Sequence, residues 1–225
     1  MSKLTVGIYL FPHMTMMDAY APLQMFSFVD AFETFTFART NEAFASDSGA
    51  LLTPQYGFDD CPEIDVLVVP GGGNTLAQMK DPEVIDFIRK AGEKARYVTS
   101  VCTGALILAE AGLLDGYEAA THWAYRDVLE SYDKVKLVDK RVAVDRNRIT
   151  GGGITAGLDF ALTVIAELTD EPTAHVMQLL FEYRPQPPFN SGGPETAPPE
   201  VVAAVRGKVG DIAADLMDYA NQRRN

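Results

Sequence analysis

The chain has 225 residues, of which 47% are hydrophobic and 22% charged, a composition that predicts one well-packed domain. Its net charge of −12 argues against binding to nucleic acid or to anionic membrane surfaces. No stretch reaches the ~18 consecutive apolar residues of a membrane-spanning helix, and the N-terminus runs directly into a strand pattern, so we predict a cytoplasmic protein. Two cysteines, Cys61 and Cys102, are too few for a disulfide framework. Three scattered histidines predict no metal site: His13, His122 and His175.

The first half of the chain alternates strand and helix patterns. A predicted helix begins near Asp18, with Pro22 placed in its first turn, and another begins after Asp81. The predicted strands are residues 4–10, 34–39, 66–69 and 97–101, with a β-ribbon over 43–56 and a further helix over 104–111.

The second half is less regular at first and then helical. Short strands are predicted over residues 119–121 and 135–138, a short helix over 125–129, and a hairpin over 142–150. Helices follow over 154–168 and from 171, then a Pro-rich arm over about 184–199 and an amphipathic C-terminal helix over about 200–223. We therefore predict a single α/β domain over residues 1–225, with a central, mostly parallel sheet.

Cys102 lies where the strand of residues 97–101 turns into the helix of residues 104–111. Such an elbow holds a nucleophile at the carboxyl edge of a parallel sheet, where α/β proteins bind ligands. The helix N-terminus predicts a thiol pKa below its free value of about 8.5. The alternative is a buried cysteine that acts only as a small hydrophobic side chain.

Three residues are candidate partners for the thiol. Asp18 follows the first strand and would reach the same sheet edge as Cys102, unless it is only a helix N-cap. His122 could form a Cys–His pair, or it could be a core histidine beside Trp123. The Thr103 hydroxyl could bind substrate or cap the helix.

Two glycine runs follow predicted strands. The run from Gly71 to Gly73 is longer than a plain turn needs, and predicts a loop whose backbone approaches a ligand. It lacks the Gly-Lys-Ser/Thr ending of a phosphate-binding loop. The second run, Gly151 to Gly153, leads into the helix of residues 154–168.

Five features together resemble the PfpI-type branch of the class I glutamine-amidotransferase-like superfamily. They are Asp18, the Pro70–Gly73 run, the elbow of residues 101–104, the Thr-His-Trp of residues 121–123, and the glycine-rich stretch of residues 150–157. Within that branch, residues 96–123, 149–162 and 188–198 resemble the hydratases that act on isocyanides.

This resemblance implies a flavodoxin-like three-layer sandwich, a homodimer, and cofactor-free hydration of an isocyanide to an N-substituted formamide. It implies Cys102 as nucleophile, Asp18 as acid and base, and Thr103 as a positioning group. The family usually has a glycine before Pro22, where this chain carries bulky Tyr20 nearby, so pocket shape is expected to differ. The residues predicted to contact substrate are Tyr20, Gly72, Gly73, His122 and Ile154.

Two other functions stay open at this point. Similar domains form the sensor half of some helix-turn-helix regulators, but the segment of residues 200–225 has four basic and four acidic residues and no basic face. An oxidant-sensing or glyoxalase-like protein would also use Cys102.

Overall fold

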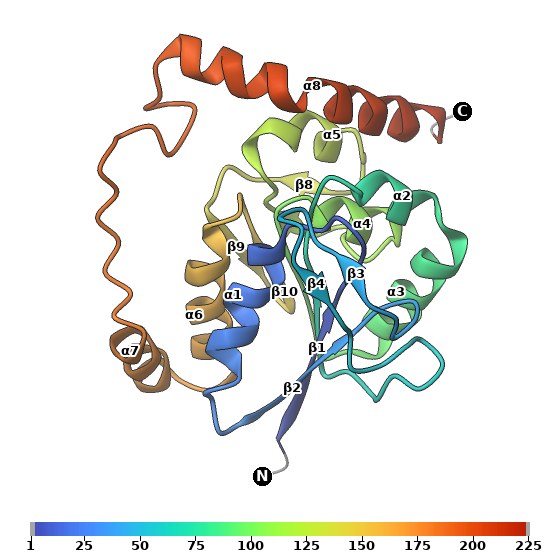
Figure 1. Cartoon of the computed structure of the whole chain (residues 1–225), viewed down its shortest axis with the longest axis vertical. Coiled ribbons are helices and arrows are strands. Elements are labelled where there is room, and N and C mark those ends of the chain that lie inside the picture. The colour runs from blue at the N-terminus through green and yellow to red at the C-terminus, as the bar shows by residue number, and fades with distance from the viewer. Residues whose placement is uncertain (1–2, 224–225) are drawn as a thin grey trace.

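The computed structural model describes residues 3–223, and its centre is a six-stranded sheet (Figure 1). The strand order is β2-β1-β5-β6-β10-β9, and every pairing is parallel except that of β9 with β10. The predicted α/β class and mostly parallel sheet are confirmed. The strands are β1 (Leu4–Tyr9), β2 (Phe32–Phe37), β5 (Val66–Val69), β6 (Tyr97–Val101), β9 (Val142–Asp145) and β10 (Arg148–Gly151).

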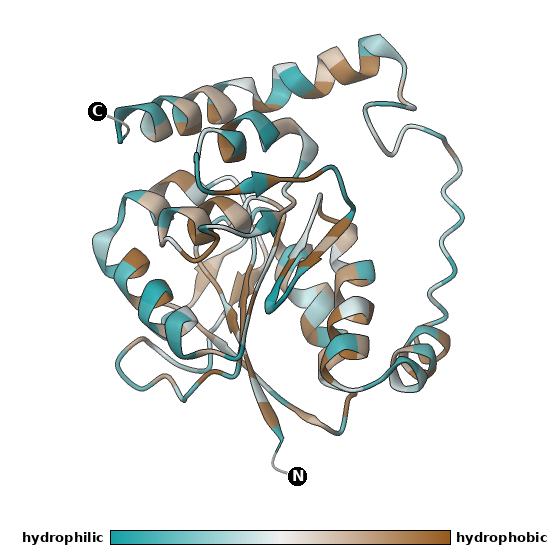
Figure 2. Cartoon of the chain, turned by 180° about the vertical axis from the view of Figure 1, so that it is seen from behind, coloured by the Kyte–Doolittle hydropathy of each residue, from teal (hydrophilic) through white to brown (hydrophobic). Residues whose placement is uncertain are grey.

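Helices cover both faces of this sheet, which gives three layers (Figure 1). On one face lie α1 (Met16–Phe26) and α6 (Ala156–Leu168), with α7 (Glu171–Leu180) packed on α6. On the other lie α2 (Thr75–Lys80), α3 (Pro82–Lys94) and α4 (Gly104–Glu110). Strand β5, in the middle of the sheet, consists only of buried apolar residues because both its faces are covered. Figure 2 colours the chain by hydropathy. Within residues 3–223, no helix has both the length and the apolar character needed to cross a membrane.

The structure corrects one helical prediction and adds one helix that the sequence did not predict. Helix α1 begins at Met16, so Pro22 lies in its interior and not in its first turn. Because proline has no N–H, the carbonyl of Asp18 loses its partner four residues on. The ring of Pro22 is instead buried toward Gly157 of α6. Helix α2 was not predicted, because its six residues are too few to show a helical period.

The short strands pair outside the main sheet. The predicted ribbon is the antiparallel pair β3 (Phe44–Ala45) and β4 (Leu51–Leu52). The strands predicted near residues 119 and 136 are the parallel pair β7 (Glu118–Ala119) and β8 (Lys136–Leu137). Between them lie a 3-10 turn (Trp123–Tyr125) and α5 (Arg126–Glu130).

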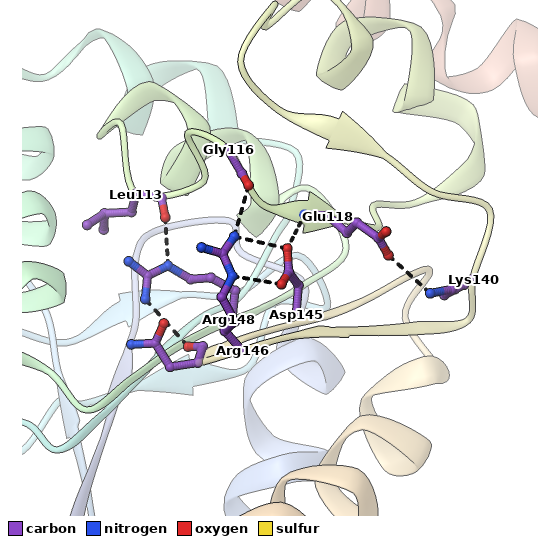
Figure 3. Close-up of polar contacts among 8 residues, drawn as sticks. Leu113, Gly116, Glu118, Lys140, Asp145, Arg146 and Arg148 are labelled. Carbon is purple, nitrogen blue, oxygen red and sulfur yellow. Dashed lines mark hydrogen bonds and ion pairs between the residues drawn. The ribbon is translucent and has the colours of Figure 1, made fainter.

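The β9–β10 hairpin is tied to the loop after α4 by two arginines (Figure 3). Arg146 binds the Asp145 carboxylate and donates to the carbonyl of Gly116, while Arg148 Nε donates to the carbonyl of Leu113 at 2.7 Å. Both guanidinium groups lie over the ring of Tyr117, at 3.7 and 4.5 Å from its centre. This edge of the sheet is therefore fixed by side chains as well as by the strand pairing.

The chain ends in α8 (Pro199–Gln222), which lies across the end of the molecule near α5 (Figure 1). Its anchor is Glu110 of α4, which is 7% exposed. Glu110 accepts hydrogen bonds from Tyr132 and Tyr219 and pairs with Arg223. The arm between α7 and α8 has no regular structure and is mostly exposed, so it hugs the surface less closely than predicted.

Candidate functional site

The carboxyl ends of β1, β5, β6 and β10 meet at one edge of the sheet, as parallel strands require. The loop after β1 leads to Asp18, the loop after β5 contains the glycine run, and β6 leads straight into Cys102. Since β5 lies between β1 and β6, the glycine run that follows β5 lies between the Asp18 segment and the Cys102 segment.

Cys102 forms the predicted elbow. Its φ of +59° is a left-handed backbone conformation that few residues other than glycine adopt. Its N–H donates to the carbonyls of Gly151 (3.1 Å) and Gly152 (2.8 Å), and Thr121 Oγ1 donates to its carbonyl at 2.8 Å. These bonds hold the strained turn against the end of β10. The residue is 6% exposed, so the thiol is almost shielded from water.

Asp18 is fully buried and is not a helix cap, because Thr15 occupies the N-cap of α1. Its Oδ2 accepts a hydrogen bond of 3.0 Å from the backbone N–H of Gly71. Its Oδ1 is buried without a hydrogen-bond partner of normal geometry among residues 3–223. The structure thus points one carboxylate oxygen at the glycine loop and leaves the other available.

Asp18 and Cys102 lie close enough to change each other's proton affinity. Burial raises the pKa of Asp18 from 3.8 to about 7, while the Gly71 N–H and the Cys102 thiol act to lower it. Burial and the Asp18 carboxylate raise the pKa of the Cys102 thiol well above its usual range. The predicted lowering of that pKa by the helix N-terminus is therefore wrong, because desolvation and a neighbouring negative charge outweigh it.

Thr103 supports the elbow and the sulfur. Hydrogen bonds from its N–H and hydroxyl act to lower the pKa of Cys102, against the larger effects of burial and Asp18. Its Oγ1 accepts from the N–H of Gly72 at 3.0 Å and shares a 2.8 Å hydrogen bond with Thr75 Oγ1. Thr103 is thereby fixed between the glycine loop and Cys102.

Two glycines allow the segments to approach this closely. A Cβ on Gly71 would lie 2.4 Å from Thr103 Oγ1 and 3.1 Å from the Cβ of Cys102. A Cβ on Gly104 would lie 2.0 Å from the carbonyl oxygen of Val69. A side chain at either position would push the elbow away from the end of β5, so neither glycine is a mere turn residue.

The other predicted substrate contacts are placed less directly. Gly72 already donates its N–H to Thr103, and Gly73 is exposed with open space where a Cβ would be. Tyr20 is half-buried on α1 and lies two residues after Asp18, which turns it to a different side of the helix. Contact of Tyr20, Gly72 or Gly73 with substrate stays a prediction.

His122 and Ile154 line a cavity beside the elbow. Burial and the charge of Arg126 lower the pKa of His122, so this imidazole is neutral at pH 7, and its Nδ1 accepts from the N–H of Ala124. Tyr125, which the sequence analysis did not single out, packs against His122 and is buried; the thiol of Cys102 contributes to raising its pKa. Tyr125 lies in a short segment without a clear helical or strand period, so the sequence did not indicate that its side chain faces inward.

The buried carboxyl predicts an unusual dependence of stability on pH. The pKa of Asp18 rises on folding, so between about pH 4 and pH 7 the native chain binds more protons than the unfolded chain. Stability contributed by this group is present at low pH and falls as pH rises through that window. We expect Asp18→Asn to be more stable than wild type at pH 8, by about 2–4 kcal/mol, and to lose this advantage near pH 4. Urea unfolding of both proteins at the two pH values measures the difference, and an advantage that does not change with pH would contradict it.

A parallel sheet with a left-handed cysteine elbow and a buried carboxyl beside it defines a class of α/β proteins. The chain matches the profile of the DJ-1/PfpI family over residues 4–167 and belongs to that family. Among individual relatives, it is 45% identical over 203 residues to isonitrile hydratase from Pseudomonas putida, across 90% of this chain and 89% of the relative.

Other relatives show how widely the domain is used. The chain is 29% identical to the HTH-type transcriptional regulator GbdR from Pseudomonas aeruginosa over 80% of its own length, but it spans only 50% of that regulator. A solved structure of a THiJ/PfpI family protein from Pseudomonas syringae superposes with a TM-score of 0.94 at 40% identity, over 98% of this chain and 91% of the other. Drosophila melanogaster DJ-1beta shares the fold at 22% identity and a TM-score of 0.69, over 81% of this chain and 98% of its own.

Proposed function

We propose that this protein is an isonitrile hydratase, which adds water to an isocyanide and releases an N-substituted formamide. The observation that carries the proposal is the pairing of a buried carboxyl whose pKa is about 7 with a cysteine elbow. The identity of 45% to a hydratase over nearly the whole chain supports it. A carboxyl that is half protonated near neutral pH can both give and take a proton, as this reaction requires.

In the first step, the Cys102 sulfur attacks the terminal carbon of the isocyanide. A carbon–sulfur bond forms, the thiol proton passes to Asp18, and Asp18 delivers a proton to the same carbon. The product is a thioimidate, in which the carbon carries one hydrogen, the sulfur and the doubly bonded nitrogen. Because burial and Asp18 raise the thiol pKa, the sulfur holds its proton at rest, and Asp18 acts as the adjacent base that removes it for the attack.

In the second step, water attacks the thioimidate carbon and Asp18 takes a proton from it. Asp18 passes that proton to the nitrogen, the carbon–sulfur bond breaks as the carbonyl forms, and the proton of the new hydroxyl goes to the departing sulfur. The sum is one isocyanide and one water giving one formamide. Thr103 positions the sulfur in both steps, and the Gly71 N–H holds the carboxyl in place.

Turnover in labelled water tests the proposal. Purified protein incubated with cyclohexyl isocyanide in H₂¹⁸O should yield N-cyclohexylformamide that carries ¹⁸O. Mass spectrometry of the product measures the incorporation. A Cys61→Ala variant serves as a control and should retain turnover, because Cys61 lies near Thr5 and Asp65 at the amino ends of the strands, whereas Cys102 follows the carboxyl end of β6. Isocyanide that is consumed no faster than in buffer would exclude the function.

We also propose that the protein works as a cytoplasmic homodimer. Helix α7 presents an apolar face to solvent, and Leu179 is 82% exposed beside exposed Val176 and Leu180. Exposed apolar patches of this kind mark protein contacts. We expect Leu179→Lys combined with Leu180→Lys to convert a dimer to a monomer in light scattering. A wild-type protein that is already monomeric at micromolar concentration would contradict the dimer.

A further inference from the structure

A cavity with a volume of about 350 Å³ lies beside the elbow, which is within the size range of small-molecule sites. Four segments far apart in the sequence form its walls: residues 121–126, 139–141, 152–155 and 192–195 of the arm. It lies at the carboxyl edge of the sheet, where such folds bind small molecules. The proposed reaction uses none of its side chains.

The cavity is joined to the nucleophile by its own walls. Thr121 and Gly152 line it, and both are hydrogen-bonded at 2.8 Å to the backbone of Cys102. Tyr125 packs against His122, a wall residue, and lies near enough to Cys102 for the charge on the sulfur to raise its pKa. The cavity therefore adjoins the cysteine elbow through residues that they share.

The chemistry of the walls is unusual for so acidic a chain. Its apolar lining residues include Trp123, Ile154 and Pro194. Its charged lining residues are more often positive than negative, although the whole protein carries a charge of −12. Those charged residues are Arg126, Lys140, Arg141, Asp139 and Glu195.

Arg126 has one hydrogen-bond donor without a partner among the described residues. One of its terminal nitrogens pairs with Asp139, whereas Nε is buried and has no partner among residues 3–223. Leaving a buried donor unpaired costs about 1–3 kcal/mol, so an unpaired Nε on an arginine that lines a cavity favours an additional hydrogen-bond acceptor from a ligand. By contrast, Arg141 is engaged by Asp159 and Thr155. A guanidinium fork is the natural partner of a carboxylate.

We propose, building on the hydratase function above, that this cavity receives the nitrogen substituent of the isocyanide and that Arg126 selects substituents that carry a carboxylate. The preferred substrates are then isocyanides of the amino-acid type, with an anionic group a few bonds from the isocyanide nitrogen. Trp123 and Ile154 hold the aliphatic part of that substituent.

A matched substrate pair tests the selection. Isocyanoacetate and isocyanoacetamide have nearly the same shape and differ in charge. We expect kcat/KM to be about tenfold higher for the acetate, the value of one charge-assisted hydrogen bond. In Arg126→Gln the preference should fall to about twofold or less, and Arg126→Lys, which keeps the charge and loses the fork, should be intermediate. Arg39→Gln is the control, because Arg39 is an ion-paired arginine outside the cavity and should leave the preference intact.

The outcomes separate this inference from the proposed function. Equal hydration of both substrates by wild type, or an undiminished preference in Arg126→Gln, would overturn the carboxylate selection and leave the hydratase intact. If neither substrate is hydrated, binding still decides the matter, because Trp123 is the only tryptophan in the sequence and lines the cavity. N-formylglycine should change the fluorescence of Trp123 at a lower concentration than N-formylglycinamide does. Equal half-maximal concentrations for the two ligands would reject the site.

Discussion

Asp18→Asn should lower kcat/KM for isocyanide hydration by about 10³-fold, to near the level of Cys102→Ala, which has no nucleophile. Asparagine keeps the shape of the side chain and can still accept from the Gly71 N–H. It cannot take the thiol proton or return one to carbon. Both steps of the proposed reaction pass through this carboxyl, so the loss should appear in kcat and not only in KM.

The same substitution should make Cys102 more reactive toward an alkylating reagent. The Asp18 carboxylate raises the pKa of the thiol, so its removal lowers that pKa and increases the thiolate fraction. At pH 8 the rate of modification by iodoacetamide should rise several-fold while hydration falls. A structural collapse would raise alkylation of Cys61 as well, and peptide mapping separates the two cysteines.

Asp47→Asn provides the matched control for this prediction. Asp47 is a neighbouring carboxylate whose charge acts on Asp18, and its side chain accepts from the N–H of Met16. It makes no contact with Cys102, so its replacement should leave most of the hydration activity. Equal losses in Asp47→Asn and Asp18→Asn would show that general acidity of the loop matters and not proton transfer by Asp18.

Much of the site's outline follows from chain order alone. Asp18 and Cys102 each come just after a predicted strand, and the carboxyl ends of parallel strands share an edge, so their meeting could be expected before the structure was known. The elbow was also predictable, because β-branched residues give way to an Ala- and Leu-rich helix at Cys102. Both features depend on hydrophobic periodicity and on the order of segments along the chain, and both can be read from the sequence.

The proton affinities could not be predicted in the same way. The sign of the thiol pKa shift depends on a balance among burial, the Asp18 charge and the Thr103 donors. Sequence shows only the helix N-terminus, which favours the opposite direction. Position in a motif therefore indicates a candidate nucleophile, whereas the surrounding three-dimensional packing sets its protonation state.

The positions of the Arg126 and Tyr125 side chains could not be predicted for a different reason. They lie between two-residue strands, in a segment where neither the period of two nor that of 3.6 persists long enough to predict which side chains face inward. The cavity that Arg126 borders is formed by the arm and by three other segments, and no local sequence pattern indicates such an assembly.

Gly104→Ala should destabilise the protein by about 3 kcal/mol or more, although alanine is the better helix former. The added Cβ would lie 2.0 Å from the carbonyl oxygen of Val69 and 2.8 Å from that of Pro70. Both obstacles are backbone atoms at the end of a buried central strand, so no side-chain rotation relieves them. The free energy of urea unfolding measures the effect.

Gly207→Ala is the control for that substitution, because it makes the same chemical change inside a helix. Gly207 lies on α8 with no atom within 4 Å of the position a Cβ would take, so alanine should stabilise the chain by about 0.5–1 kcal/mol. Opposite signs at the two positions would show that α4 must approach β5 without a side chain between them. That approach also sets Cys102 beside Asp18, so Gly104→Ala protein that remains folded should lose hydration as well. Full activity in a folded Gly104→Ala variant would mean that the elbow tolerates displacement, and with it that the carboxyl and the thiol need not be held this closely.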